Sequence, residues 1–346
     1  MKKYLLFFLL TAVLSVGVVS AQAAKFRVAI VMPSTITDLS WSQAMYDALT
    51  GVQTAMGGAD KMEIAYTENM FDVTAAAQAI RDYADEGYNL IIAHGTQYGT
   101  SLFDIAPDYP NTSFAWGTAT DTGADQGIKN IFAYQADAEQ GGYVEGVMAA
   151  LMCTSGTIGI VGPIPAGDAL LYINGFQQGV LATRPEINIL LAYTGGFGDT
   201  AAAAQVAQTQ ISAGADVLTG SAQQVVGAID AIQTAKGYWF GTQFDQSGQW
   251  PNTVVASQQY DWKPAITDMI AKIQAGTFGG TVYTLTLENK GLIFVYGKVA
   301  IPDAVKTAAD AAVAGIISGD IVVKQDLTEA TPEATMEMTA EATPSS

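Results

Sequence analysis

The chain has 346 residues, of which 49% are hydrophobic, 35 are glycine, one is cysteine and one is histidine. Its 15 Lys and Arg against 33 Asp and Glu give a formal net charge of −18, which opposes binding to nucleic acids and to anionic lipid surfaces. The length predicts two domains, and the glycine content is typical of a compact α/β protein. The shortage of histidine and cysteine argues against a zinc site. We expect no metal or other cofactor.

Residues 1–23 have the pattern of a signal peptide. Lys2 and Lys3 precede an apolar run from Tyr4 to Val19, and Ala21-Gln22-Ala23 follows as a small-x-small cleavage site. The alternative is a retained anchor helix, for which the run is short. We therefore expect an exported protein, periplasmic or on the cell surface, with no membrane span after cleavage. The only cysteine, Cys153, lies far inside the chain. We therefore expect no lipid anchor on a cysteine at the leader junction.

Strand and helix patterns alternate after the leader. Short β-branched runs are separated by helical stretches at Ser42–Met56 and Thr74–Glu86; these strands are Phe26–Val31, Met62–Tyr66, Leu90–Ala93 and Ser113–Trp116. Such a series predicts a parallel sheet with helices on both faces. At the end of the second helix Gly87 is placed to act as a left-handed C-cap.

The same rhythm restarts after residues 121–134. Further strands are expected at Thr157–Val161, Ile187–Tyr193, Val217–Thr219 and Tyr238–Gly241, with helices at 168–182, 200–213 and 223–235. Gly214 repeats the C-cap position of Gly87. The fold class is thus α/β, with two doubly wound parallel-sheet lobes.

The last folded segments are expected to return to the first lobe. They comprise strands at Thr253–Ser257, Thr281–Leu287 and Leu292–Val295 and helices at 263–275 and 302–317. A chain that crosses between the lobes more than once forms a multi-strand hinge. The predicted division is residues 24–120 plus about 254–326 for the N-terminal lobe and 121–253 for the C-terminal lobe. Residues 327–346 are a Thr/Glu/Ala/Pro run of low complexity, for which we expect a disordered tail.

Five short motifs, in this order, carry a resemblance to a known family. They are Thr37-Asp38-Leu39-Ser40-Trp41-Ser42, His94-Gly95-Thr96-Gln97-Tyr98, Gln140-Gly141-Gly142-Tyr143-Val144-Glu145-Gly146, Gly159-Ile160-Val161-Gly162-Pro163-Ile164-Pro165 and Phe244-Asp245-Gln246. The chain from about Phe26 to Ile317 resembles the basic membrane protein family of ABC transporter solute receptors, within the type I periplasmic binding proteins. The resemblance implies a receptor that captures a purine base or nucleoside and delivers it to an ABC permease.

The motifs that follow strands should face one cleft, because ligands of open parallel sheets lie beyond the carboxyl ends of the strands. At the first of these ends the ring of Trp41 is suited to stack on a flat heterocycle while Asp38 accepts its N–H groups, and Ser42 belongs to the same motif. The alternative is structural: Asp38 or Ser40 caps the helix and Trp41 is a hydrophobic staple.

Five further residues complete the expected ligand site. Phe197 either closes over the other face of the ligand or plugs the top of the second lobe. Gln97 offers a donor and an acceptor to a purine edge. The resemblance implies that Asp245 accepts hydrogen bonds from ribose hydroxyls, with an Asx turn before Gly248 as the alternative. It also implies hinge and ligand contacts for Tyr260 and Trp262.

Catalysis is not expected. The sequence has no Gly-x-Ser-x-Gly elbow and no phosphate-binding Gly-x-x-x-x-Gly-Lys loop, and His94 has no adjacent nucleophile or orienting acid. We expect His94 to be a hydrogen-bonded residue of the cleft floor. Two other functions stay open: a sensor or surface receptor that uses the same cleft, and an exported nucleoside hydrolase. Base, nucleoside and other flat ligands also stay open.

Overall fold

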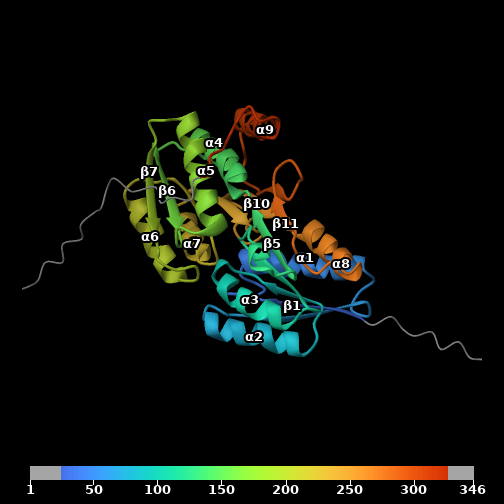
Figure 1. The fold of residues 1–346 in the computed structure, drawn as a ribbon. Helices are drawn as coiled ribbons and strands as arrows, with labels where there is room; N and C mark the ends of the chain where they lie inside the picture. Colours follow the sequence, from blue (N-terminus) through green and yellow to red (C-terminus); the bar gives the residue numbers. More distant parts are fainter. Residues whose placement is uncertain (1–24, 326–346) are drawn as a thin grey trace, which may run out of the picture.

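The protein is described here as a computed structural model, covering residues 25–325. The predicted signal peptide and tail therefore lie outside the described residues. Two six-stranded sheets form the cores of two lobes, with helices on both faces of each sheet (Figure 1). This is the expected α/β class with two doubly wound lobes.

The first sheet has the strand order β11-β5-β4-β3-β1-β2, and all its strand pairs are parallel. Its strands are β1 (Phe26–Val31), β2 (Met62–Thr67), β3 (Leu90–Ala93), β4 (Ser113–Gly117), β5 (Ile131–Ala136) and β11 (Val282–Leu285). The helices around it are α1 (Trp41–Ala55), α2 (Val73–Asp85), α3 (Gly99–Ile105) and α8 (Lys263–Gln274).

The second sheet has the order β12-β10-β9-β8-β6-β7, in which only β12 runs antiparallel to its neighbour. Its strands are β6 (Thr157–Gly162), β7 (Asn188–Tyr193), β8 (Val217–Gly220), β9 (Tyr238–Gln243), β10 (Val254–Tyr260) and β12 (Leu292–Tyr296). Its helices are α4 (Ala138–Met152), α5 (Gly167–Thr183), α6 (Thr200–Ser212), α7 (Val225–Thr234) and α9 (Asp303–Ser318).

Local signals explain where two of the helices begin and end. The Asp72 carboxylate accepts the Ala75 N–H at the start of α2, and Asp199 accepts the Ala202 N–H at the start of α6. Beyond the far ends of these helices, Gly87 and Gly214 have φ values of 77° and 100°. Both predicted glycine caps are confirmed.

The lobe boundaries differ from the expected ones at three strands. Strand β5, expected in the second lobe, lies in the first sheet between β4 and β11. Strands β10 and β12, expected in the first lobe, belong to the second sheet, and α9 packs against α4 there. The reason is that a strand joins whichever sheet offers it pairing partners, and its own sequence does not specify those partners.

The chain passes between the sheets three times, from β5 to β6, from β10 to β11 and from β11 to β12. These crossings form the predicted multi-strand hinge. Among the described residues, no helix is long and apolar enough to span a bilayer.

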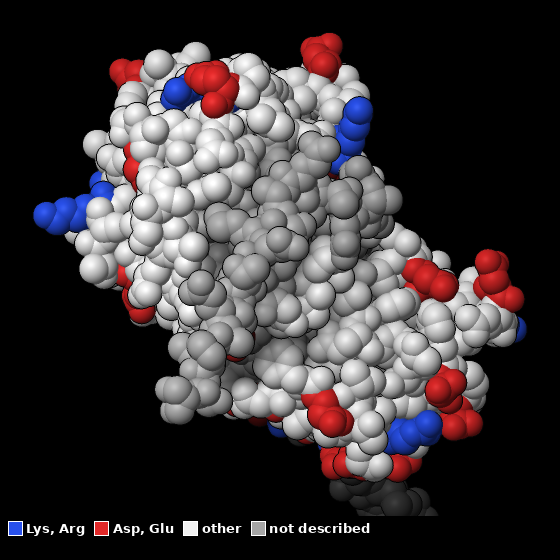
Figure 2. Space-filling model, turned by 90° about the vertical axis from the view of Figure 1, so that its left-hand side faces the viewer, with Lys and Arg blue, Asp and Glu red and all other residues white. Residues whose placement is uncertain are grey.

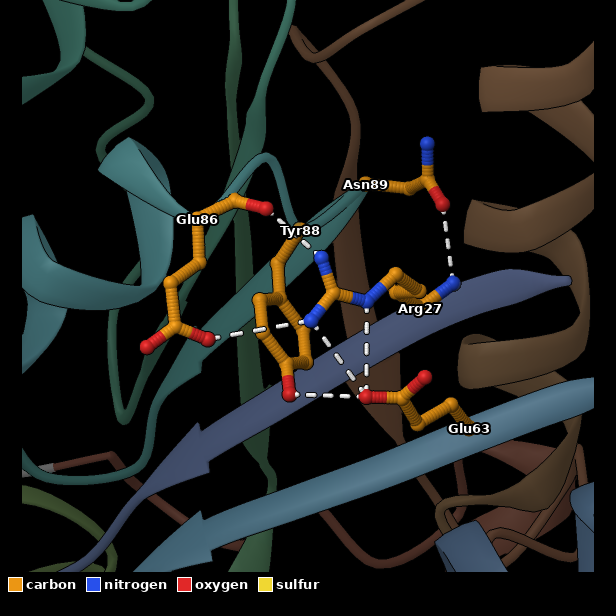
Figure 3. A network of polar contacts seen from close by, with 5 residues as sticks. All are labelled: Arg27, Glu63, Glu86, Tyr88 and Asn89. Atoms are coloured by element: carbon orange, nitrogen blue, oxygen red, sulfur yellow. Dashed lines mark hydrogen bonds and ion pairs between the residues drawn. The ribbon is translucent and has the colours of Figure 1, made fainter.

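A charged cluster of the first lobe lies where β1 begins, at the opposite end of that strand from the loop that follows it (Figure 3). The Arg27 guanidinium lies 3.9 Å from the centre of the Tyr88 ring and donates to the Glu86 carbonyl oxygen at 2.6 Å. Glu63 accepts from Arg27 at 3.4 Å and from the Tyr88 hydroxyl at 3.0 Å. The Asn89 side chain accepts the Arg27 backbone N–H, so the cluster joins β1, β2 and the start of β3.

Candidate ligand-binding site

A cavity lies between the lobes, at the carboxyl ends of strands from both sheets, as the parallel topology predicts. The first lobe contributes loops after β1, β3 and β4, and the second contributes loops after β6, β7, β8 and β9. The lining residues are Pro33, Trp41, Gly95, Thr96, Gln97 and Thr118 from the first lobe and Ala166, Asp168, Ala169, Phe197, Ala222, Gln223 and Gln243 from the second.

The two lobes touch each other around this cavity. The Ser40 hydroxyl donates to Gln243 Oε1 at 2.5 Å, and the Gln246 side chain donates to the Leu39 carbonyl oxygen at 3.3 Å. The volume of this cavity is about 40 Å³, which is room for only a few water molecules. Because sites for drug-sized ligands span roughly 300–1,000 Å³, the lobes must move apart to admit a ligand.

Backbone strain gathers at the same place. Thr118, Ala222 and Gln243 have φ values of 56°, 73° and 75°, in the left-handed region that non-glycine residues rarely adopt. All three line the cavity, and each follows or ends a strand. Left-handed non-glycine residues cost of order 1 kcal/mol or more each and concentrate at functional sites.

Trp41 presents an aromatic surface to the cavity from the first turn of α1. Its indole is 5% exposed and stacks on the His94 imidazole, with ring centres 4.0 Å apart and planes 2° apart. The indole N–H donates to the His94 carbonyl oxygen at 3.0 Å. One face of the indole is thus covered by His94, and its orientation is fixed.

His94 is fully buried and uncharged. Its Nε2 lies 2.9 Å from the Trp41 carbonyl oxygen, and its Nδ1 lies 2.7 Å from the Tyr134 hydroxyl. A carbonyl only accepts, so Nε2 carries the proton and Nδ1 accepts from Tyr134. Burial lowers the pKa of His94 to about 3, which keeps the imidazole neutral. These contacts agree with the expected hydrogen-bonded residue of the cleft floor.

Tyr260 and Trp262 contact Trp41 and lie outside the cavity lining. Their rings meet the Trp41 indole edge to face, with centres at 6.4 and 6.0 Å, and both residues are almost completely buried. Tyr260 ends β10 and Trp262 precedes α8, so both lie where the chain crosses back to the first lobe. This places them at the hinge, and their ligand contacts stay a prediction.

Asp38 and Ser42 also lie outside the lining. The Asp38 carboxylate accepts the backbone N–H groups of Ser40, Ser42 and Gln43 at 2.9–3.1 Å, which is the capping arrangement at the start of α1. Burial raises the pKa of Asp38, and these N–H donors offset part of that rise. The Ser42 hydroxyl accepts the Ser34 N–H at 3.3 Å. The structural alternative for Asp38 therefore accounts for its contacts.

Gln97 and Phe197 line the cavity from opposite lobes, and both are half-buried. Phe197 lies on the loop after β7, so the cavity has one aromatic residue from each lobe, Trp41 and Phe197. Asp245 lies outside the lining and accepts the Ser247 N–H at 2.8 Å, which is an Asx turn. Its contact with a ribose stays a prediction.

The comparisons with known proteins identify the family. The family of PnrA-like ABC transporter substrate-binding proteins matches residues 25–326. The chain belongs to this family. It is 27% identical over 314 residues to a purine-binding protein of Brucella abortus, covering 88% of this chain and 86% of that one. It is 23% identical over 310 residues to an ABC transporter nucleoside-binding protein of Lactococcus lactis, covering 83% and 86%.

The fold comparison agrees with the family. An ABC transporter solute-binding protein from Aeropyrum pernix has a TM-score of 0.76 at 18% identity, covering 87% of this chain and 94% of that one. The chain thus has the type I periplasmic binding protein fold, and its family is one of ABC transporter substrate-binding proteins.

Sequence reasoning missed the polar residues of the second lobe. Asp168 is 3% exposed in the first turn of α5, and Gln223 follows β8; both line the cavity. Asp168 Oδ2 and Gln223 Oε1 have no hydrogen-bond partner within the described chain. The sequence offered only one indication that these two residues line the cavity, namely that each lies just after a strand of the second lobe.

The described residues hold no group of three or more His, Cys, Asp or Glu side chains placed to bind a metal ion. On the face drawn in Figure 2, Asp and Glu are scattered and Lys and Arg are few. The cavity lining contains no Lys or Arg.

Proposed function

We propose that the protein captures a purine base or nucleoside between its lobes, outside the cytoplasm, and delivers it to the permease of an ABC importer. The observation that carries the proposal is the aromatic surface of Trp41, held flat by His94 on one face, opposite a lobe that contributes Phe197. A planar heterocycle fits between two such rings. The purine-binding and nucleoside-binding relatives support this class of ligand.

Binding is tested by calorimetry and thermal shift with adenine, hypoxanthine, guanine, their nucleosides, ribose, glucose and amino acids. Stabilisation by purines and not by sugars or amino acids is the expected result. Stabilisation by sugars or amino acids alone would contradict the ligand class and leave the fold untouched.

Stacking is tested at Trp41. Trp41→Leu keeps an apolar side chain and removes the flat ring, so it should weaken purine binding roughly 5- to 150-fold, the equivalent of about 1–3 kcal/mol. Trp41→Phe should retain most of the affinity. The control is Trp250→Phe, since Trp250 is buried in the second lobe and bonded to Asp230, away from the cavity. Equal affinity in wild type and Trp41→Leu would rule out the stack.

A substitution at Asp245 distinguishes binding of a nucleoside from binding of a free base. If this carboxylate accepts from ribose, Asp245→Ala weakens nucleoside binding and leaves base binding unchanged. Delivery requires its own measurement, namely uptake of labelled purine into cells with and without the gene.

A further inference from the structure

Asp168 is a buried carboxyl group that faces the cavity. It lies in the first turn of α5, is 3% exposed and belongs to the lining, and its Oδ2 atom has no hydrogen-bond partner among residues 25–325. A buried polar atom without a partner costs about 1–3 kcal/mol. Its position in the wall of a ligand cavity identifies the ligand as the missing partner.

The surroundings of Asp168 disfavour a negative charge. The ionisable groups that influence it are Glu139 of α4, Asp137 before α4, Tyr134 of β5 and Tyr260 of β10, none of which is cationic. Burial raises the pKa of Asp168 well above its usual value, and the two neighbouring acids add to the rise; the Ala136 N–H opposes it. These surroundings favour the neutral, protonated form of the carboxyl group over the charged one.

A neutral carboxyl group has a distinct recognition chemistry. It presents one O–H donor and one carbonyl acceptor side by side, whereas a carboxylate only accepts. Its complement is an edge with an acceptor next to an N–H donor. Adenine has such an edge at N1 and its amino group, and hypoxanthine has one at O6 and N1–H. Gln223 Oε1, also unpartnered and in the same lining, accepts one further N–H.

We propose that Asp168 binds the ligand as a neutral carboxylic acid, pairing with an adjacent donor and acceptor on the edge of the heterocycle. This inference rests on the proposed function and deepens it, because it assigns the polar recognition of the base to the second lobe. The ring stacks between Trp41 and Phe197, and Asp168 selects the edge.

The test compares three variants by calorimetry with adenine and hypoxanthine at pH 7. Asp168→Asn keeps a donor beside an acceptor and should bind within about threefold of wild type. Asp168→Ala removes both and should lose roughly 10- to 100-fold. The matched control is Glu145→Gln, which replaces another fully buried acid outside the cavity and should leave affinity unchanged. Thermal melts without ligand establish that each variant folds.

Two results would overturn the inference. Equal binding by wild type and Asp168→Ala would remove Asp168 from the site. Equal loss in Asp168→Asn and Asp168→Ala would mean that a charged carboxylate is required. Both leave purine binding by the wild type intact, whereas failure of the wild type to bind any purine would overturn the proposed function itself.

Discussion

His94 shows how one side chain determines the shape of the cleft. It supports the Trp41 ring from behind, donates to the Trp41 carbonyl oxygen and accepts from Tyr134, all without exposure to water. These buried contacts link the three residues to one another, so we expect them to act as a unit. The orientation of the Trp41 ring, and with it the proposed stacking on a ligand, depends on that unit.

Replacing His94 tests this coupling. His94→Phe keeps a ring against Trp41 but removes the hydrogen bonds to the Tyr134 hydroxyl and to the Trp41 carbonyl oxygen, so unfolding free energy should fall by about 2–4 kcal/mol. Urea denaturation measures the loss. Tyr134→Phe should cost less in the His94→Phe background than in wild type, because its partner is already absent. If the losses of unfolding free energy in the two single variants add up to the loss in the double variant, the residues do not act as a unit.

Asp38 separates capping from ligand contact. Asp38→Ala should lower unfolding free energy by about 1–2 kcal/mol, because three backbone N–H groups at the start of α1 lose their acceptor. Asp38→Asn retains a side-chain oxygen and should lose less. Thermal melts check stability, and purine titrations check affinity. A large loss of affinity with unchanged stability would favour the ligand role over the cap.

Helices α4 and α5 cross at very short distance, and glycines make that possible. A Cβ atom on Gly142 would lie 2.4 Å from the Tyr172 carbonyl oxygen, and one on Gly179 would lie 2.0 Å from that of Tyr143. Gly146 and Gly175 meet the opposite backbone in the same way. The glycines of the motif from Gln140 to Gly146 therefore serve packing, and through it they position the first turn of α5, where Asp168 lies.

Gly179→Ala tests the crossing. Alanine favours an isolated helix by about 1 kcal/mol over glycine, but here the added methyl group would overlap backbone that cannot move away. We expect a net loss of about 3 kcal/mol or more in unfolding free energy, measured by urea denaturation. Gly248→Ala is the control, since nothing lies within 4 Å of its Cβ position, and should stay within about 0.5 kcal/mol. Similar effects at both sites would refute the close crossing.

Across the whole molecule, buried acids make folding depend on pH. Burial raises the pKa of Glu139 from 4.5 to about 7, so the folded state binds more protons than the unfolded state between these values. The stability contribution is complete below pH 4.5 and is lost as pH rises through 7. His94 acts in the opposite direction: its pKa, lowered from 6.5 to about 3, gives stability that is lost as pH falls through that range.

Glu139→Gln tests the contribution of Glu139 to the pH dependence of stability. Glutamine keeps an acceptor for the Gln325 side chain, which donates to Glu139 Oε1 at 2.9 Å, and cannot ionise. The variant should be more stable than wild type at pH 8, by up to about 3 kcal/mol, and the difference should vanish near pH 4.5. Urea denaturation at several pH values measures it. A difference independent of pH would contradict this linkage.

A substitution where the two lobes meet tests whether the lobes must close for binding. A Cβ atom on Gly198 of the second lobe would lie 2.8 Å from the Phe71 ring of the first. Gly198→Leu should therefore disfavour the closed form and weaken purine binding roughly tenfold, with a larger radius of gyration in X-ray scattering. Phe71→Ala in the same chain should restore affinity. Failure of the second change to restore it would show that closure is not what the leucine impairs.

The sequence by itself determined the type and order of most elements, the two glycine caps and the general position of the cleft. These depend on local periodicity, on the left-handed conformation of glycine and on the rule that loops after parallel strands share one edge. Trp41, Gln97 and Phe197 were predictable as cavity residues for that reason, since each lies on or just beyond such a loop.

Only the tertiary structure decided which sheet receives β5, β10 and β12, and which polar groups are left without partners. Strand pairing is a contact between segments distant in the chain, so the strand's own residues do not specify it. Asp38 and Asp168 are both buried acids next to a helix start, yet three N–H groups donate to the first, whereas Oδ2 of the second has no partner in the described chain. The difference is the supply of donors around each carboxyl group, which depends on how the folded chain surrounds it.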